Sequence, residues 1–293
     1  QVLGANGGET LRIGTSHFSR EYANTLVQYN YFDRTNGEHE IISNKSSGNT
    51  FIGNVFFEAQ GTLTMRHGHY TRVENNYFLG NRKPNTGGIR IINEHQTVSN
   101  NYLYGLTGRR FRGALVIMNG VPNSPPNRYD PVIESQMDNN VVIDSDYIQL
   151  GAGADEERSA PPSRSQMHNN IILGKQNLNP ITVFDDVSGI SFKGNVLNEK
   201  ASNPIESGFT TVPYEVTQNE QGLWVPAQSL LDEIGFGEVK LPVEKQDTGA
   251  PYYEKRESQV AFDSGREIHV APGIDTLVKA LDKSAAGDVL VLD

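Results

Sequence analysis

Short apolar runs recur along the first two hundred residues, and an asparagine stands before each of them. The usual motif is Asn or Gly, then Asn, then two or three apolar residues, as in "GNVFF", "NNYFL" and "NNIIL". The second asparagine occupies positions 30, 54, 76, 101, 140, 170 and 195, at intervals of 22 to 39 residues. A repeat of this length with one short strand motif per turn is typical of a solenoid.

A second apolar run precedes each of these motifs: "TLRIG", "HEIIS", "TLTMR", "GIRII", "ALVIM", "YIQLG" and "ITVF". Two or three short strands per turn, with no helix between them, predict a parallel β-helix. Asparagines at one register in every turn are expected to stack into an internal ladder of side chains. We therefore assign residues 1–200 to an all-β parallel β-helix domain.

The repeat fades after residue 200, where Pro, Glu and Gln become frequent. We interpret residues 201–266 as a cap and linker, with one short helix in "PAQSLLDEIGF". Residues 267–293 are expected to begin a second β-helix domain. There Asp275 would cap an amphipathic helix over 276–285, and "GDVLVLD" would form a strand.

Composition excludes several kinds of protein. No run of apolar residues is long enough to span a membrane. Without cysteine, neither disulfides nor thiolate metal sites can form, and a net charge of −10 disfavours nucleic acid as a partner. The first residues lack the pattern of a signal peptide, and we expect the chain to be a piece of a longer protein whose first turns are missing. No pattern indicates an oligomeric state.

Two acids stand close together in "GEHEIISNKSS". Glu38 and Glu40 are two residues apart on a predicted strand, so both side chains project to the same side. Their mutual repulsion is relieved by a cation. Calcium accepts irregular sets of about six to eight oxygen ligands, and Asn6, one turn earlier, could supply a carbonyl oxygen.

Three cationic residues are expected beside these acids. Lys45, Arg66 and Arg90 lie nine, ten and eleven residues before the asparagines of their own turns. Equivalent positions on successive turns of a β-helix stack at the strand spacing, so the three side chains should follow one wall.

An anionic pocket beside a row of cations suits β-elimination on a uronic acid. A metal would draw charge from the sugar carboxylate and acidify the neighbouring C–H, a lysine could take that proton, and an arginine or lysine could assist the departing oxygen. Taken singly, each residue has a plainer explanation. A Glu-x-Glu pair is usually a solvated strand face, a lysine at a strand end usually serves solubility, and His67 alone is usually a hydrogen-bonded residue. Their shared face and neighbouring turns favour the site.

The segments "GEHEIISNKSSGNTFIGN" and "QGTLTMRHGHYTRVENNYFLGN" resemble polysaccharide lyase family 6, which contains alginate lyases and chondroitinase B. The resemblance covers roughly residues 1–200 and implies a right-handed parallel β-helix. It implies that Lys45 is the Brønsted base that removes the C5 proton and that Arg66 is the Brønsted acid that protonates the O4 leaving group. It also implies calcium as cofactor, bound by Glu38, Glu40 and the Asn6 of "NGGETLRIG".

The same resemblance indicates which residues contact substrate. Arg12, His67 and Arg90 match groove positions of the family. The insertions "RRFRGALVIMNGVPNSPPNRY" and "IQLGAGADEERSAPP" resemble those of the alginate-cleaving members. We add candidates that could bind further carboxylates or contact the polymer, namely Arg109, Arg110, Arg112, Arg128 and Tyr129.

The sequence thus predicts a calcium-dependent alginate lyase that leaves 4,5-unsaturated ends on an anionic polysaccharide. Substrate size and the family's habit imply a secreted, periplasmic or cell-surface enzyme. A second domain that closes one end of the groove would favour exolytic cleavage. Preference for guluronate or mannuronate is not predicted.

Three other functions remain open. One is a chondroitin or dermatan sulfate lyase of the same family, and another is a non-catalytic glycan-binding β-solenoid. The third is a β-helical glycoside hydrolase whose acid pair would be Glu38 and Glu40, or come from residues 155–157.

Overall fold

The computed structural model describes the chain except for residues 1–6, 235, 237–238, 240–241, 250–259 and 261–262. Its contacts divide the chain into two compact units, Gln1–Gly249 and Ala250–Asp293.

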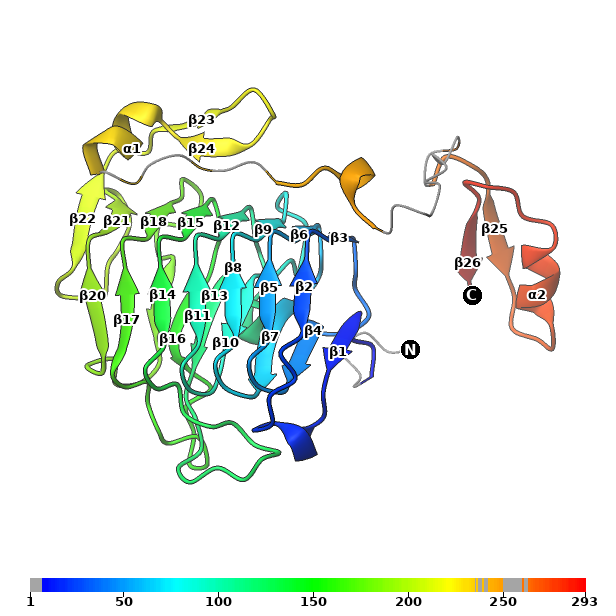
Figure 1. Ribbon diagram of the computed structural model, residues 1–293. Coiled ribbons are helices and arrows are strands. Elements are labelled where there is room, and N and C mark those ends of the chain that lie inside the picture. Colours follow the sequence, from blue (N-terminus) through cyan, green and yellow to red (C-terminus); the bar gives the residue numbers. More distant parts are fainter. Residues whose placement is uncertain (1–6, 235, 237–238, 240–241, 250–259, 261–262) are drawn as a thin grey trace. The chain divides into compact units, whose positions relative to one another are not determined.

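The first unit is a right-handed parallel β-helix with three parallel sheets, as predicted (Figure 1). The first sheet contains β1 (Leu11–Ile13), β4 (Glu40–Lys45), β7 (Thr62–His67), β10 (Ile89–Ile91), β13 (Leu115–Met118), β16 (Ile148–Ala152) and β19 (Ile181–Val183). These strands are the predicted apolar runs that precede each asparagine motif.

The other two sheets complete each turn. The second sheet contains β2 (Leu26–Gln28), β5 (Thr50–Ile52), β8 (Arg72–Glu74), β11 (Thr97–Ser99), β14 (Gln136–Asp138), β17 (Ser165–His168) and β20 (Ile190–Lys193). The third contains β3 (Tyr31–Asp33), β6 (Val55–Phe57), β9 (Tyr77–Leu79), β12 (Tyr102–Tyr104), β15 (Val141–Ile143), β18 (Ile171–Leu173), β21 (Asn195–Asn198) and β22 (Phe209–Val212). Since β22 pairs with β21, the coil extends beyond residue 200, where the sequence repeat ends.

The repeated asparagines form the predicted ladder at the corner between the second and third sheets. Each of the first six donates its backbone N–H and its side-chain amide to the Oδ1 of the asparagine in the following turn. The ladder runs through Asn30, Asn54, Asn76, Asn101, Asn140, Asn170 and Asn195, with N···O distances of 2.9 to 3.1 Å. Buried polar groups require such partners, so the ladder satisfies the corner of the coil internally.

The residue before each ladder asparagine explains why the motif begins with Asn or Gly. Gly53, Asn75, Asn100, Asn139 and Asn169 all have φ between 55° and 66°. This left-handed region is open to glycine and is tolerated by asparagine better than by most other residues. The first residue of the motif therefore turns the chain, and the second joins the ladder.

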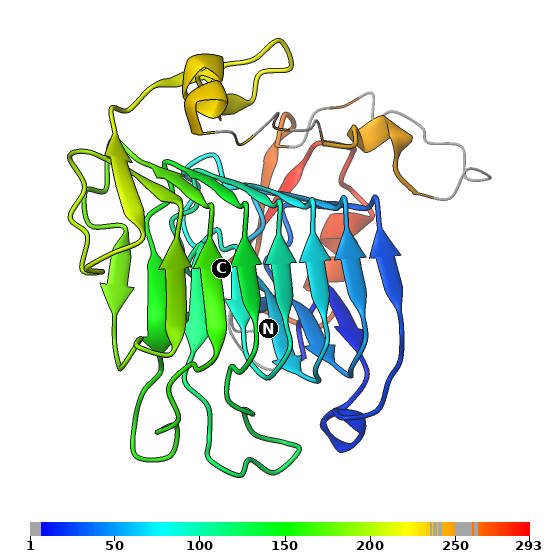
Figure 2. The same cartoon turned by 60° about the vertical axis from the view of Figure 1, so that its left-hand side comes forward.

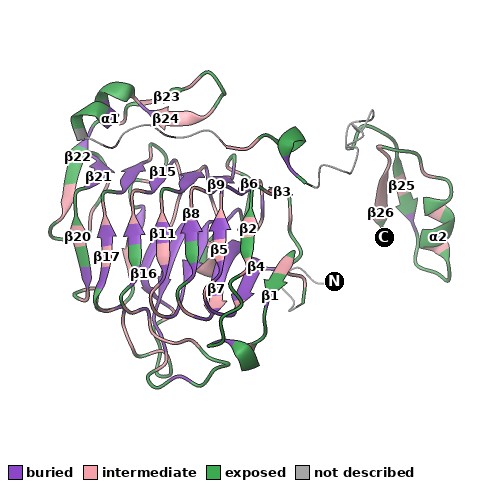
Figure 3. Cartoon of the chain, in the orientation of Figure 1, coloured by how far each residue is buried: buried purple, intermediate pink, exposed green. Residues whose placement is uncertain are grey.

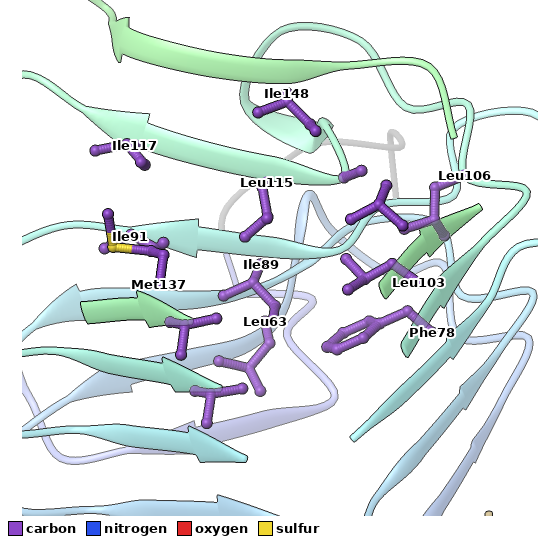
Figure 4. Packing of buried hydrophobic residues seen from close by; sticks show 14 of the residues in the cluster. Leu63, Phe78, Ile89, Ile91, Leu103, Leu106, Leu115, Ile117, Met137 and Ile148 are labelled. Atoms are coloured by element: carbon purple, nitrogen blue, oxygen red, sulfur yellow. The ribbon is translucent and has the colours of Figure 1, made fainter. Parts of the chain in front are cut away.

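Inward side chains stack along the axis and form the core (Figure 4). In the first sheet Ile42, Leu63, Ile89, Leu115 and Ile148 share one register and are at most 1% exposed. Phe32, Phe56 and Phe78 of the third sheet stack with parallel rings whose centroids are 4.7 and 4.6 Å apart. Figure 3 shows much of the coil's strand surface buried, whereas the connecting segments mix buried, intermediate and exposed residues.

Long connections gather on one side of the coil (Figures 1 and 2). They are the segment with the 3-10 helix η1 (Ser16–Phe18) and the two insertions that follow β13 and β16. We call residues 119–131 the first insertion and 153–162 the second insertion. A further 3-10 helix, η2 (Arg110–Arg112), precedes β13.

After β22 the first unit continues with an antiparallel pair, β23 (Val216–Gln218) and β24 (Trp224–Pro226). The helix α1 (Gln228–Ile234) follows, as predicted for this segment, and then the 3-10 helix η3 (Lys245–Asp247). Among the described residues, none of the helices has the length and apolar character needed to cross a bilayer.

The second unit pairs β25 (Glu267–Val270) in parallel with β26 (Val289–Leu292), joined by α2 (Thr276–Leu281). The helix is shorter than predicted, and the expected cap by Asp275 is wrong. Asp275 precedes the helix with φ at 59° and forms no capping hydrogen bond. In this backbone conformation the Asp275 side chain does not reach the free amides of the first helical turn. Its position just before the helix was therefore not enough to predict a cap.

Candidate active site

A change of register in β4 sets up the site. Cα pairing with β7 shifts between Glu40 and Ile42 and again between Ser43 and Lys45. Ile41 and Ile42 are both buried, while the Ser43 hydroxyl donates to Glu40 Oε2 at 2.6 Å. The irregularity therefore brings Glu40 and Ser43 together although they are three residues apart, which a regular two-residue alternation would prevent.

Three carboxylates meet beside this strand. Glu9, Glu38 and Glu40 each offer an oxygen within 4.8 Å of the other two. Glu38 and Glu40 are buried, and Glu9 is half-buried. We call these three residues the acidic cluster. The sequence predicted two of them, and Asn6, the third ligand predicted, lies outside the described residues.

Backbone contacts hold Glu38 in place. Its Oε2 accepts hydrogen bonds from the amides of Gly7 at 2.9 Å and Gly8 at 3.2 Å. A side chain at Gly37 would meet the Gly8 carbonyl oxygen at 2.3 Å, so only glycine allows the two segments to approach this closely. Burial raises the pKa of Glu38, and the charges of Glu9 and Glu40 act in the same direction, although the two amides oppose them.

The donor set fits a hard divalent cation. Carboxylate oxygens are the ligands that such ions prefer, and three converging carboxylates repel one another unless positive charge lies between or beside them. Burial is the main cause of the raised pKa of Glu38, and the charges of Glu9 and Glu40 add to it; a cation beside them would relieve that repulsion.

Cations surround the acidic cluster on adjacent turns, as the repeat predicted. Lys45 Nζ lies 3.8 Å from Glu9 Oε1. Arg66 Nη1 and Arg90 Nη1 lie 3.3 and 3.4 Å from the same Glu40 oxygen. Lys45, Arg66 and Arg90 come from β4, β7 and β10, which are neighbours in the first sheet.

Tyr129 from the first insertion covers the two arginines. Its hydroxyl accepts a hydrogen bond from Arg90 Nη2 at 2.7 Å and a second one from Arg66. The Arg66 guanidinium lies over the Tyr129 ring at 4.6 Å, and that of Arg90 over the Phe111 ring, also at 4.6 Å. Stacking and hydrogen bonding together fix both guanidinium planes.

His67 is a neutral group within this basic surface. It is 2% exposed and pairs in register with Lys45. Burial, followed by the charges of Arg66 and Lys45, lowers the pKa of His67 to about 4. At neutral pH its imidazole therefore carries no charge and can accept or donate a hydrogen bond.

The remaining predicted substrate-binding arginines differ in exposure and in the element that carries them. Arg12 is exposed on β1, in register with Ser43, and forms no ion pair with the described residues. Arg112 is half-buried in η2, and its charge helps to lower the pKa of His39 after burial. Arg109 and Arg110 are exposed beside it.

Arg128 already has a partner in this structure. It forms an ion pair with Glu157, so the first and second insertions are joined above the groove. A small pocket lies between them, lined by Arg66, Val121, Asn127, Arg128, Tyr129, Glu157 and Arg158.

Sequence reasoning missed Glu9. It lies three residues after Asn6 in "NGGETLRIG", and its acidic side chain was the available signal. Spacing along a strand identified Glu38 and Glu40, whereas Glu9 joins them across turns.

Fold and site together define a right-handed parallel β-helix that carries an acidic cluster beside a row of three cations from neighbouring strands of one sheet. The sequence profile of the chondroitinase B family matches residues 2–238. The chain belongs to polysaccharide lyase family 6, in which chondroitinase B and the alginate lyases are grouped.

Solved structures of this family are similar over the whole chain. The alginate lyase AlyGC is 50% identical with a TM-score of 0.83, covering 99% of this chain and 40% of its own. A mutant of AlyGC is 49% identical with a TM-score of 0.84, covering 100% and 40%. This chain thus spans about 40% of the length of these two relatives.

A more distant relative is described as a mannuronic acid specific family 6 lyase from human gut microbiota. It is 29% identical with a TM-score of 0.65, covering 80% of this chain and 52% of its own. A search of the curated proteins finds no match.

Proposed function

We propose that this chain forms the catalytic part of a calcium-dependent alginate lyase that cleaves by β-elimination. One observation carries the proposal. An amine and a guanidinium from adjacent strands flank one acidic cluster, with Lys45 Nζ 3.8 Å from Glu9 and Arg66 Nη1 3.3 Å from Glu40.

The proposed reaction assigns one role to each cation. Lys45, in its neutral form, takes the C5 proton of a uronate, and the C–H electrons form the C4=C5 double bond. The C4–O4 bond breaks as that double bond forms, and Arg66 delivers a proton to the departing oxygen. General acid and base catalysis of this kind contributes about 10²- to 10⁴-fold.

The acidic cluster would hold the cofactor. Glu9, Glu38 and Glu40 would bind calcium, joined by Asn6 if that residue lies where the family resemblance implies. Calcium bound there would supply positive charge to the sugar carboxylate and so acidify the adjacent C–H.

Groove residues would orient the polymer. Arg66 and Arg90 both donate to Glu40 Oε1 and to the Tyr129 hydroxyl, which fixes them beside each other. Buried, neutral His67 would add a polar group without charge to the wall that the polymer meets. Arg12, Arg110 and Arg112 would meet further carboxylates of a polyuronate.

The relatives support alginate as the substrate. AlyGC is described as an alginate lyase, one relative as mannuronic acid specific, and another alginate lyase, AlyF-OU02, as solved in complex with G6. A polymer of this kind does not cross membranes, so we also propose that the enzyme acts in the periplasm, at the cell surface or in the medium.

The test is direct. Purified chain is mixed with alginate and calcium, and the ultraviolet absorbance of the unsaturated uronate is followed. We expect a rise that a chelator stops and added calcium restores. Release of saturated reducing ends without that absorbance would contradict the proposal. Dermatan sulfate, tested in parallel, distinguishes the chondroitinase-type alternative.

Substitution separates the lysine's role from that of a surface charge. Lys45→Ala should lower kcat by about 10²- to 10⁴-fold because the base is lost. The matched control is Lys193→Ala, an exposed lysine at the end of β20 in the second sheet, which should retain full activity. Equal activity of the two variants would contradict the assignment.

A hydrolytic mechanism has weaker support. It needs two available carboxyl groups, whereas Asp155 pairs with Arg158 and Glu157 with Arg128. The acidic cluster in turn stands beside cations that a hydrolase would not require.

A further inference from the structure

One carboxylate of the first insertion, that of Asp130, contacts two other segments of the coil. Its side chain is 13% exposed and accepts hydrogen bonds from two separate turns of the coil. Arg20 Nη2, from the segment after η1, lies 3.1 Å from Asp130 Oδ1. His69 Nε2, from the turn after β7, lies 3.3 Å from Asp130 Oδ2.

The orientation of both donors is fixed. The backbone N–H of Glu94 donates to His69 Nδ1 at 3.3 Å, so in the neutral ring the hydrogen is on Nε2 and faces Asp130. Arg20 Nη2 also donates to the Ser124 carbonyl oxygen at 2.8 Å. The hydrogen bonds from His69 and Arg20 hold the pKa of Asp130 below its usual value, although burial acts in the opposite direction.

Other side chains also contact this insertion: Arg128 pairs with Glu157, Tyr129 accepts from Arg66 and Arg90, and Asn119 donates to Asp185. Residues 122–123 and 125–128 are exposed. Backbone bonds join Gly120 to Ala160 and Val121 to Tyr129, and the Asn93 amide donates to the Asp130 carbonyl oxygen at 3.1 Å. Asp130 is therefore the side chain that joins this exposed loop to Arg20 and His69, in addition to the contacts of Tyr129 and Arg128.

The neighbouring residue is the one that reaches the site. Tyr129 precedes Asp130 directly, and its hydroxyl accepts from both Arg66 and Arg90. Its ring also lies against the two guanidinium groups, at 4.6 and 5.4 Å. A displacement of Asp130 would therefore move the group that orients both arginines beside Glu40.

We propose that Asp130, held by Arg20 and His69, is a positioning residue that places the Tyr129 hydroxyl between Arg66 and Arg90. It touches none of the reacting groups and acts through Tyr129. The expected effect on kinetics rests on the proposed lyase activity. The expected effect on the position of Tyr129 rests on the contacts of Asp130 with Arg20 and His69.

The test is a double-mutant cycle in the full 293-residue chain, with Asp130→Asn, Tyr129→Phe and both together. The matched control is Asp138→Asn on β14, an outer-face carboxylate that accepts hydrogen bonds from Gln166 and His168 in the second sheet. Kinetics on alginate, thermal midpoints and amide hydrogen exchange of residues 119–131 are measured for each variant.

Asp130→Asn should lower kcat/KM by about 10- to 100-fold, because small misplacements of a reacting group are costly. The kcat/KM of the double variant should equal that of Tyr129→Phe within about twofold, because both substitutions remove the same effect, the placement of the Tyr129 hydroxyl. Amides of residues 119–131 should exchange faster in Asp130→Asn and not in Asp138→Asn.

Losses that multiply in the double variant would overturn the inference, as would unchanged exchange in Asp130→Asn. If Asp130→Asn merely destabilised the whole protein, its thermal midpoint would fall. Its loss of kcat/KM would then multiply with that of Tyr129→Phe. If the wild-type chain does not cleave alginate, the proposed function fails, and the exchange measurement still decides whether Asp130 holds the loop.

Discussion

His67 is an uncharged imidazole surrounded by positive charge. Its pKa is lowered to about 4, first by burial and then by Arg66 and Lys45. When the pH falls below the ordinary histidine pKa, the ring binds a proton in the unfolded chain but stays neutral in the folded chain. Its contribution to stability is thus complete above the ordinary histidine pKa and is lost as the pH falls toward about 4.

We therefore expect His67→Gln to flatten the dependence of stability on pH. Between neutral pH and about pH 4, the free energy of unfolding of the wild type should fall relative to the variant by up to about 3 kcal/mol. Denaturant unfolding of both proteins at several pH values measures this difference. Parallel curves for the two proteins would show that the ring titrates normally.

At the scale of elements, the asparagine ladder is the feature that defines each turn. Asn101 accepts two hydrogen bonds from Asn76 and donates to Val73 O at 2.8 Å and to Asn140 Oδ1 at 2.9 Å. Asn101→Ala should lower the free energy of unfolding by about 2–5 kcal/mol, because buried donors and acceptors lose their partners. Urea unfolding measures it.

Asn30→Ala is the matched control for the ladder. Asn30 is half-buried at one end of the ladder and donates to Asn54 and to the Gln28 carbonyl oxygen. Because water can replace a partner there, the loss should stay below about 1.5 kcal/mol. Equal losses in the two variants would mean that the ladder does not account for the cost.

The elements that could be predicted from sequence are those that repeat. Asn-apolar motifs and the runs before them placed the strands of the coil, because stacking converts a sequence period into a register. Lys45, Arg66 and Arg90 followed from the same period. The helical cap at Asp275 was mispredicted because cap geometry depends on a backbone angle that the sequence does not reveal.

Contacts that do not follow the period could not be predicted. Arg20 and Asp130 are 110 residues apart, and they meet only because an insertion folds back over the groove. Glu9 joins Glu38 through a close approach of two glycine segments. Neither contact produces a local pattern in the sequence, because both depend on how the connections run between turns of the coil.

At the scale of the whole molecule, the proposed calcium site lies within one unit. The acidic cluster and its cations come from residues 9–90, and the large core cluster also lies in the first unit. In the second unit α2 and then β26 follow one another, the order expected at the start of a second β-helix, and β25 precedes them. We propose that this segment begins such a domain.

A chain ending at Gly249 should therefore bind calcium with a Kd within about twofold of that of the full chain. This is well below the tenfold change in Kd that corresponds to about 1.4 kcal/mol. Titration calorimetry measures both. Glu38→Gln in the shortened chain should abolish the heat of binding. A folded fragment that binds no calcium would show that the site needs residues of the second unit.

Every rung of the asparagine ladder points the same way, from an amide in one turn to an oxygen in the next. The corner of the coil thus has a polarity that its three sheets do not reveal by their outline. If the coil were cut between two turns of the ladder, its rungs would leave amide hydrogens on the earlier turn and Oδ1 atoms on the later turn. The return bonds, such as that from Asn101 Nδ2 to the Val73 carbonyl oxygen, would leave the reverse arrangement beside them. The two faces would therefore be complementary to each other at two kinds of bond.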